Sequence, residues 1–130
     1  MRKHLAIMDK PTIEAILSGI KTIETRFSLH KIAPFCQIGV GDVIYMKSPG
    51  GEIVGQFKVK KVIFFEGLTL SDLGYLSDLY KREISAEKEY WERKKDAKFG
   101  TLIFISESER FITSPIKIKK SDQRGWMVLD

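Results

Sequence analysis

This sequence has very little cysteine, histidine and proline, and it lacks any long apolar run. Its 130 residues include one cysteine, two histidines and four prolines. A single cysteine excludes an intramolecular disulfide framework and a cysteine-based zinc cluster, so a reducing compartment is the expected setting. His30, the mid-chain histidine, has no partner at ligand spacing. The sequence therefore predicts no metal site and no cofactor.

The apolar run near the beginning of the chain is too short to act as a targeting segment. It spans Leu5 to Met8 and follows a basic tetrapeptide. A signal peptide needs an apolar run of about seven residues or more, and a membrane-spanning helix needs about 20. We therefore expect a cytoplasmic protein that does not associate with a membrane.

The composition is that of one ordinary globular domain over residues 1–130. It is 43% hydrophobic and 30% charged, with no repeat or linker-like stretch, and a chain of this length can bury a core without disulfide bonds. The net charge of +5 suits contact with a polyanion such as RNA. Many soluble proteins are equally basic, so the charge alone does not decide the function.

Hydrophobic spacing predicts an α+β fold with five or six strands and about three helices. Helices are expected from Pro11 to Gly19, over Thr69–Tyr80, and over Ala86–Ala97 with Ser85 as its cap. Strands are expected at Leu5–Met8, Val43–Ser48, Ile53–Phe65, Gly100–Ile105 and Gly125–Leu129, and the segments Phe111–Ile112 and Ile116–Lys119 are expected on an exposed edge. This order favours a mostly antiparallel β-barrel with peripheral helices over a parallel sheet.

The long predicted strand Ile53–Phe65 changes its alternation at Lys60 and Lys61. Polar residues occupy one face up to Lys60, and the residues from Val62 to Phe65 are apolar on both faces. A slip of one residue in a period-2 pattern predicts a β-bulge. Small barrels need such a bend in a strand.

The stretch from Gly19 to Arg26 carries the chemistry of most interest. Gly19 can adopt the left-handed conformation that caps the end of a helix. We expect the turn that follows to bring the side chains of Lys21, Glu24 and Arg26 together at the opening of one cleft. Lys21 and Arg26 can donate to phosphate or carbonyl oxygens, and Glu24 can accept from a base amino group. The alternative is an ion pair that pins the loop, so we interpret Glu24 and Arg26 as partly structural and Lys21 as facing a ligand.

A second candidate group lies around the predicted hairpin. Lys47 and Ser48 precede its turn, and Tyr45 could stack on a base. A solvated hairpin lysine is an equal alternative for Lys47. Phe27 and Trp126 are further candidates for stacking on a base. Aromatic residues on strands more often lie in the core, and we expect a core position for Trp126.

Two other features have simpler expected roles. Cys36 lies in an apolar-looking run and is predicted to be a small buried hydrophobe. Six lysines could form a basic stripe that follows a nucleic-acid backbone. A row of solvated side chains is the more common role for such lysines. The six are Lys58, Lys60, Lys61, Lys117, Lys119 and Lys120.

The segment Gly19-x-Lys21-x-x-Glu24-x-Arg26 resembles the GxKxxExR signature of the ASCH domain, a family of the PUA-like superfamily. Gly41-Asp42 and Val54–Val59 resemble the family's later strands. The resemblance covers essentially the whole chain. It implies a β-barrel with helices at its rim, and a cleft that receives the motif's charges and takes RNA or a nucleotide-type ligand.

The same resemblance implies a hydrolase as an alternative. Some small ASCH proteins are amidohydrolases on acetylated cytidine that use a Lys, a Thr and a Glu, and ribonuclease activity is associated with other members. Lys21 matches the Lys, Glu24 stands at the Thr position, and Glu83 corresponds loosely to the Glu. Glu24 would then act as a general base on water while Lys21 stabilises the oxyanion.

These observations lead to a binding protein for RNA or a nucleotide-type ligand, and they leave open whether it is an enzyme. The ligand would contact Lys21, Glu24, Arg26, Lys47, Ser48 and Tyr45; an enzyme would use Lys21, Glu24 and Glu83. A third interpretation is a protein-interaction module whose partner binds the charged helix Ala86–Ala97.

Overall fold

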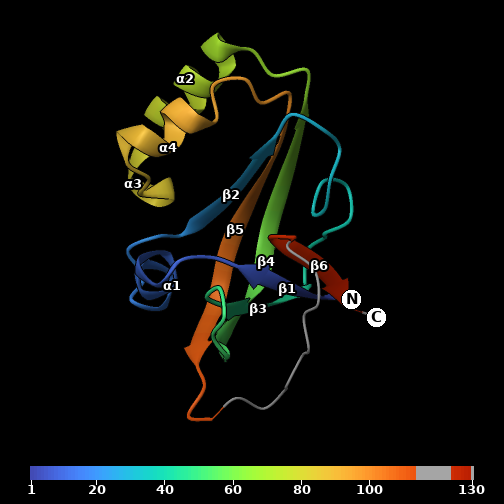
Figure 1. Cartoon of the computed structure of the whole chain (residues 1–130), viewed down its shortest axis with the longest axis vertical. Helices are drawn as coiled ribbons and strands as arrows, with labels where there is room; N and C mark the ends of the chain where they lie inside the picture. The colour runs from blue at the N-terminus through green and yellow to red at the C-terminus, as the bar shows by residue number, and fades with distance from the viewer. Residues whose placement is uncertain (114–123, 130) are drawn as a thin grey trace.

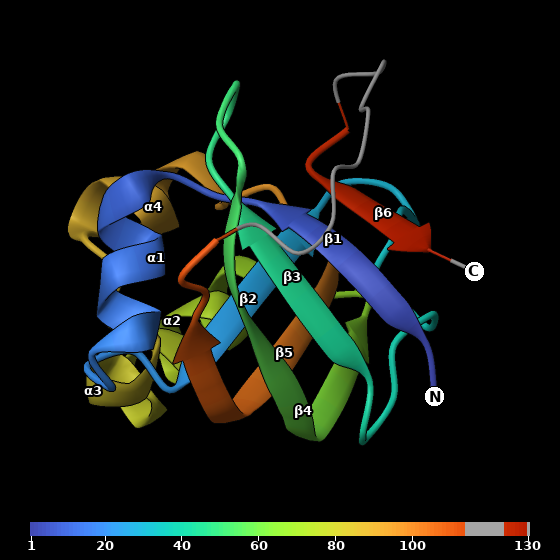
Figure 2. The same ribbon diagram turned by 90° about the horizontal axis from the view of Figure 1, so that it is seen from below.

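The computed structural model describes residues 1–113 and 124–129. In these residues six strands form one curled sheet, and helices cover one side of it (Figures 1 and 2). The strands are β1 (Lys3–Ile7), β2 (Ile23–Ser28), β3 (Val43–Lys47), β4 (Ile53–Glu66), β5 (Phe99–Arg110) and β6 (Trp126–Leu129). The helices are α1 (Lys10–Leu17), α2 (Leu70–Leu79), α3 (Lys81–Ile84) and α4 (Lys88–Arg93).

The sheet is a curled half-barrel with strand order β2-β5-β4-β3-β1-β6. Only the pair of β1 and β3 is parallel, and the other neighbours are antiparallel. The α+β class and the mostly antiparallel sheet with peripheral helices are confirmed. β2 and β6 stand at opposite ends of the strand order, so no backbone ladder joins them. We call the border between β2 and the β1–β6 end of the sheet the seam.

Local sequence explains where α1 begins and ends. Asp9 caps it by accepting a hydrogen bond from Thr12 N at 2.9 Å, and this bonding to Thr12 lowers the pKa of Asp9. Pro11 fits in the first turn because the missing N–H has no partner there. Gly19, with φ of +83°, then takes the left-handed conformation that turns the chain into the motif.

The middle helices differ from the prediction in one respect. Thr69 and Asp72 form the expected capping box of α2. The helix expected over Ala86–Ala97 is present but shorter, as α4, and a separate short helix, α3, precedes it. Ser85 is not an N-cap but the left-handed C-cap of α3, with φ of 51°. Fully buried Ile84, before the turn at Ser85, and the rings of α4, after it, pack into the same cluster.

The bulge predicted near Lys60 and Lys61 is confirmed. The pairing of β4 with β5 shifts register between Val59 and Lys61, and again between Gln56 and Lys58. The first half of β4 also pairs with β3, whereas the end of β4 packs toward the helices through Phe65. The bend allows one strand to serve two apolar clusters, as a curled sheet requires.

Side chains on the two faces of the sheet form separate cores. Inside the curl, Ile44, Met46, Phe57, Ile103 and Trp126 belong to one cluster. On the other face, Leu5, Val43 and Tyr45 form another with Phe111. A third cluster lies under the helices and includes Ile23, Phe27, Leu76, Ile84 and Leu102. Neighbouring residues of β3 therefore face different cores because side chains alternate along a strand.

Several smaller expectations need correction. Cys36 is exposed, not buried, because it sits at φ of 57° in a surface turn. Phe111 and Ile112 lie beyond the end of β5 and form no strand, and Ile112 is fully exposed. The strand expected at 116–119 falls outside the described residues. Among the helices of the described part, none has the length and apolarity needed to cross a membrane.

Candidate functional site

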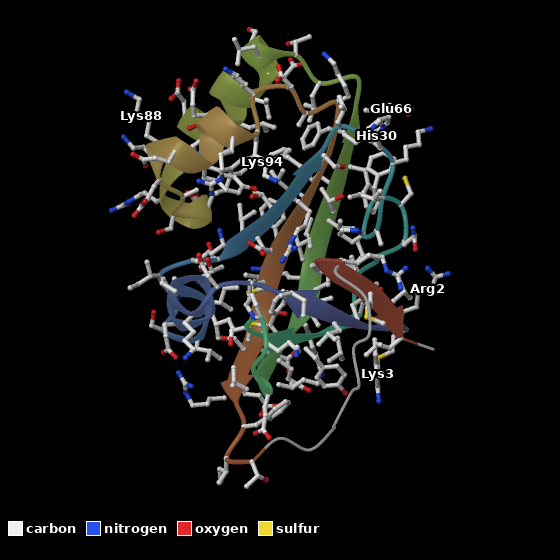
Figure 3. The ribbon with its side chains drawn as sticks, viewed as in Figure 1. Arg2, Lys3, His30, Glu66, Lys88 and Lys94 are labelled. Carbon is white, nitrogen blue, oxygen red and sulfur yellow. The ribbon has the colours of Figure 1, made fainter. Side chains whose placement is uncertain are left out.

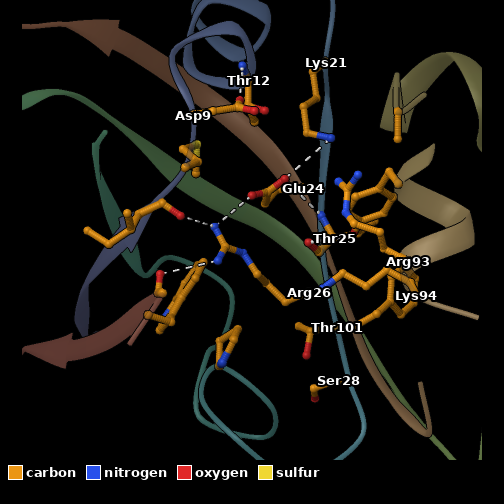
Figure 4. A pocket seen from close by; sticks show the side chains of 18 of the residues that line it. Asp9, Thr12, Lys21, Glu24, Thr25, Arg26, Ser28, Arg93, Lys94 and Thr101 are labelled. Atoms are coloured by element: carbon orange, nitrogen blue, oxygen red, sulfur yellow. Dashed lines mark hydrogen bonds and ion pairs between the residues drawn. The ribbon is translucent and has the colours of Figure 1, made fainter. Parts of the chain in front are cut away.

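Arg26 bridges the seam with its side chain. Its Nη2 donates to the backbone oxygen of Ile7 in β1 at 3.1 Å, and its Nη1 donates to that of Gly125, just before β6, at 3.4 Å. The guanidinium also lies 5.0 Å from the centre of the Trp126 ring. Arg26 therefore joins two edges of the half-barrel that no backbone ladder connects (Figure 4).

Glu24 lies between the two cations of the motif. One carboxylate oxygen is 3.1 Å from Arg26 Nη2, and the other is 3.5 Å from Lys21 Nζ. The second oxygen also accepts from Thr25 N at 3.2 Å. Glu24 and Arg26 point to one side of β2, and Lys21 reaches them because it precedes the strand in a turn. The expectation that the three charges meet is confirmed.

Lys21 lies deeper than a solvent-facing lysine. Only 6% of the residue is exposed, and Nζ donates to the backbone oxygen of Ile84 at 2.5 Å. This bond ties the motif to α3, as does the bond from Thr22 N to the oxygen of Glu83 at 2.9 Å. An ammonium has three donors, so the bonds to Ile84 and Glu24 leave one for a ligand.

These charges border a cavity of about 640 Å³. Its walls come from the end of β1, the beginning of α1, β2, the loop before Phe35, and the segment from Ser85 to Lys94. Thr101 and Trp126 also line it. The cavity thus combines charged side chains with apolar and aromatic ones, which is the usual character of small-ligand sites.

The α4 wall contributes residues that sequence reasoning did not assign to the site. The hydroxyl of Tyr90 lies 2.5 Å from Thr25 Oγ1, and burial raises the pKa of Tyr90, so the phenol stays neutral. Arg93 and Lys94 also line the cavity. Burial lowers the pKa of Lys94, and the nearby charges of Arg26 and Arg93 lower it further. The only sequence signal was a charged helix anchored by two aromatic rings.

Behind Trp126 lies a buried chain of hydrogen bonds. Trp126 Nε1 donates to His4 Nδ1 at 3.0 Å, and His4 Nε2 lies 2.8 Å from Asp42 Oδ2. Since Nδ1 accepts, His4 is the neutral tautomer with its proton on Nε2. Asp42, from the Gly41-Asp42 pair, thereby holds His4, and His4 in turn holds the Trp126 ring against which Arg26 lies. No spacing in the sequence links His4 to Trp126.

The second predicted group does not reach this cavity. Tyr45, Lys47 and Ser48 are absent from its lining. Lys47 Nζ donates to the backbone oxygen of Gly51 at 2.8 Å, so it closes its own hairpin. Tyr45 is buried on the opposite face of the sheet, beside Phe111. The side chain of Glu83 is also absent from the lining, where Glu87 and Glu89 appear instead.

The other aromatic and basic candidates have mainly structural surroundings. Phe27 is buried against Trp91, and Trp126 is a core residue as predicted. Both residues also line the cavity. Lys58 lies 3.7 Å from Glu107, and Lys61 lies over the Phe104 ring at 5.1 Å. Lys117, Lys119 and Lys120 are outside the described residues. Within the described ranges, no group of three acidic, histidine or cysteine residues could hold a metal ion.

Comparison with known proteins identifies the family. The ASCH domain matches residues 7–120. The solved ASCH structure from Zymomonas mobilis is 15% identical, with 83% of this chain and 69% of that chain covered and a TM-score of 0.62. A serine-to-alanine variant of that protein is 14% identical over 98% of this chain and 88% of that chain, with a TM-score of 0.72.

A third solved structure, of a hypothetical protein, is 21% identical, with 85% of this chain and all of that chain covered and a TM-score of 0.53. No curated protein matches the sequence. At these identities the structural likeness shows the fold, which agrees with the expected PUA-like architecture. The match to residues 7–120 shows the family, and this chain belongs to the ASCH domain family.

Proposed function

We propose that the protein binds RNA or a nucleotide-type ligand in the cavity bordered by Lys21, Glu24 and Arg26. The ASCH family is thought to bind RNA. The observation that carries the proposal is the cavity itself, at about 640 Å³ and with the motif's charges in its wall. Pockets for small ligands measure roughly 300–1,000 Å³, so the space suits one nucleotide unit of a single strand.

The three motif residues take different parts in this proposal. Arg26 and Glu24 hold the seam together and shape the cavity, since their polar atoms are used within the protein. Lys21 offers its remaining donor to a ligand oxygen. The Trp126 ring, with Arg26 on one face, forms part of the wall and is not proposed as an open stacking platform.

The hydrolase remains the second candidate because Lys21 and Glu24 lie 3.5 Å apart in the wall of the cavity. Hydrolysis would need a water placed against Glu24, since the Thr25 hydroxyl is bonded to Tyr90. Glu83 is not proposed as a catalytic carboxylate, because it does not line the cavity. Release of the acyl group from an acylated nucleoside, abolished in Glu24→Gln, would favour the hydrolase.

The binding proposal is tested by titrating dye-labelled single-stranded RNA at two salt concentrations. Binding should weaken as salt rises, because phosphate contacts release counterions. Lys21→Met keeps the length of the buried side chain without its charge, and it should weaken binding about tenfold, equivalent to about 1.4 kcal/mol.

Lys60→Met provides the matched control, because Lys60 is exposed and lies outside the lining. It should bind nearly as well as the unchanged protein, and circular dichroism should show both variants folded. Absence of RNA binding at low salt would contradict RNA as the ligand, and absence of mononucleotide binding as well would contradict the proposal as a whole. An equal loss in the two variants would show that general charge, and not the cavity, drives binding.

A further inference from the structure

The α4 side of the cavity gathers positive charge around Lys94. The ribbon and side chains in Figure 3 show Lys94 on the inner side of α4, whereas Lys88 points outward. In the close view its side chain extends toward Arg26 (Figure 4). Burial and the charges of Arg26 and Arg93 disfavour its protonated form, as the lowered pKa of Lys94 records. An anion placed here would relieve this repulsion.

Four acidic residues line the cavity, Asp9, Glu24, Glu87 and Glu89, and among the described residues none of them forms an ion pair with Arg93 or Lys94. Both carboxylate oxygens of Glu24 are already contacted, one by Lys21 and the other by Arg26. Asp9 is occupied as the cap of α1.

An independent observation comes from the floor of the cavity. Thr101 of β5 stands directly across from Arg26 of β2, so their side chains share one face of the sheet. Thr101 lines the cavity, is only 1% exposed, and its Oγ1 has no hydrogen-bond partner among the described residues. Buried hydroxyls are almost always bonded, so an unpaired one at a cavity floor points to a ligand atom that bonds it.

We propose that the ligand is a nucleotide whose phosphate binds Lys94, with Arg93 nearby, while Thr101 hydrogen-bonds to the same ligand at the floor. We call Arg93, Lys94 and Thr101 the α4 subsite. This inference rests on the proposed function and adds to it a direction of binding. The phosphate lies toward α4, and the remainder of the nucleotide occupies the cavity beside β2.

The charge part of the inference is tested by calorimetric titration with ribonucleoside 5′-monophosphates and the matching nucleosides. A monophosphate should bind at least about tenfold more tightly than its nucleoside, because charge-assisted hydrogen bonds to phosphate are about twice as strong as neutral ones. Lys94→Gln should remove this difference and leave nucleoside binding unchanged.

Lys95→Gln is the matched control, since it removes the same charge one position along the chain. Lys95 is exposed and pairs with Glu92 at 3.6 Å, away from the lining. It should retain the preference for the monophosphate. Equal losses in the two variants would overturn the subsite.

Thr101 is tested by opposite effects on stability and binding. Thr101→Val keeps the shape and removes the unpaired hydroxyl, so the midpoint of thermal unfolding should rise by a few degrees while nucleotide affinity falls several-fold. Thr101→Ser keeps the hydroxyl and should keep the affinity. A lower midpoint for Thr101→Val, or unchanged affinity, would overturn the role of Thr101.

Failure of this inference can be separated from failure of the proposed function. If single-stranded RNA binds in a Lys21-dependent way but monophosphates bind no better than nucleosides, the α4 subsite is wrong and the RNA site stands. If neither RNA nor any mononucleotide binds at low salt, both proposals fail together.

Discussion

Replacing Arg26 with alanine is expected to lower the free energy of unfolding by about 3 kcal/mol, within the roughly 3–5 kcal/mol range for breaking a buried ion pair. Three losses combine in this variant. Glu24 keeps only Lys21 as a counter-charge in a buried position. The backbone oxygen of Ile7 loses the Arg26 donor, and that of Gly125 loses one of two donors and keeps Ile7 N. The Trp126 ring is uncovered. The half-barrel would lose the bridge across its seam.

Chemical denaturation of matched variants measures this effect. Arg26→Lys keeps the charge but not the planar fork that reaches two strands and Glu24, so it should recover less than half of the loss. Arg110→Ala is the control, because its pair with Glu14 is exposed at both ends, with side-chain exposures of 52% and 61%. Exposed pairs contribute about 0–1 kcal/mol. A similar loss for Arg110 and Arg26 would contradict the bridging role.

Replacing Asp42 with alanine is expected to cost about 3 kcal/mol near neutral pH, because hydrogen bonds to charged groups contribute about 1.5–3 kcal/mol and buried unpaired donors cost more. Asp42 accepts from Arg2 N at 2.9 Å, from His4 Nε2 at 2.8 Å and from Gly39 N at 3.0 Å. All three donors would lose their acceptor. His4 is fully buried, so its N–H would have no water to replace the carboxylate.

The same variant should show a distinct pH dependence. Burial opposes ionisation of Asp42, but the bonds from Arg2 N, His4 and Gly39 N outweigh it and lower its pKa below the ordinary value of 3.8. A lowered pKa stabilises the folded state above about pH 3.8. This contribution disappears as the pH falls through the lower, folded-state value.

The free energy of unfolding, measured from pH 7 down to pH 3, checks this prediction. The difference between the unchanged protein and Asp42→Ala should be largest near neutral pH and should shrink as the solution becomes acidic. Asp78→Ala, on the exposed surface of α2, should show no such trend. A difference that stays constant down to pH 3 would show that the Asp42 carboxylate does not titrate with a lowered pKa.

Some features of this site could be predicted from the sequence because they depend on neighbouring residues. The left-handed Gly19 and the contacts of Glu24 with Lys21 and Arg26 depend on residues within a few positions of one another in the chain. The bulge in β4 followed from a slip in alternation. Cys36 misled the sequence reading, since apolar neighbours do not reveal a surface turn.

Other features depended on which face of the sheet a residue takes. Tyr45 and Met46 are adjacent in β3, yet one packs with Phe111 on the outer face and the other with Trp126 inside the curl. A hairpin pattern predicts the alternation but does not tell which face lines a cavity. For that reason Tyr45, Lys47 and Ser48 were plausible candidates, although the structure places them outside the cavity.

The sequence by itself determined the family, the α+β class with a mostly antiparallel sheet, and the meeting of Lys21, Glu24 and Arg26, because periodicity, capping and a short motif are local. Only the tertiary structure decided what surrounds these charges. Arg26 reaches Gly125, 99 positions away, and Trp126 reaches His4, 122 positions away. Curling of the sheet and docking of α4 onto β2 also bring Lys94 and Thr101 to the cavity. Such contacts follow from packing of the whole chain, which no local pattern encodes.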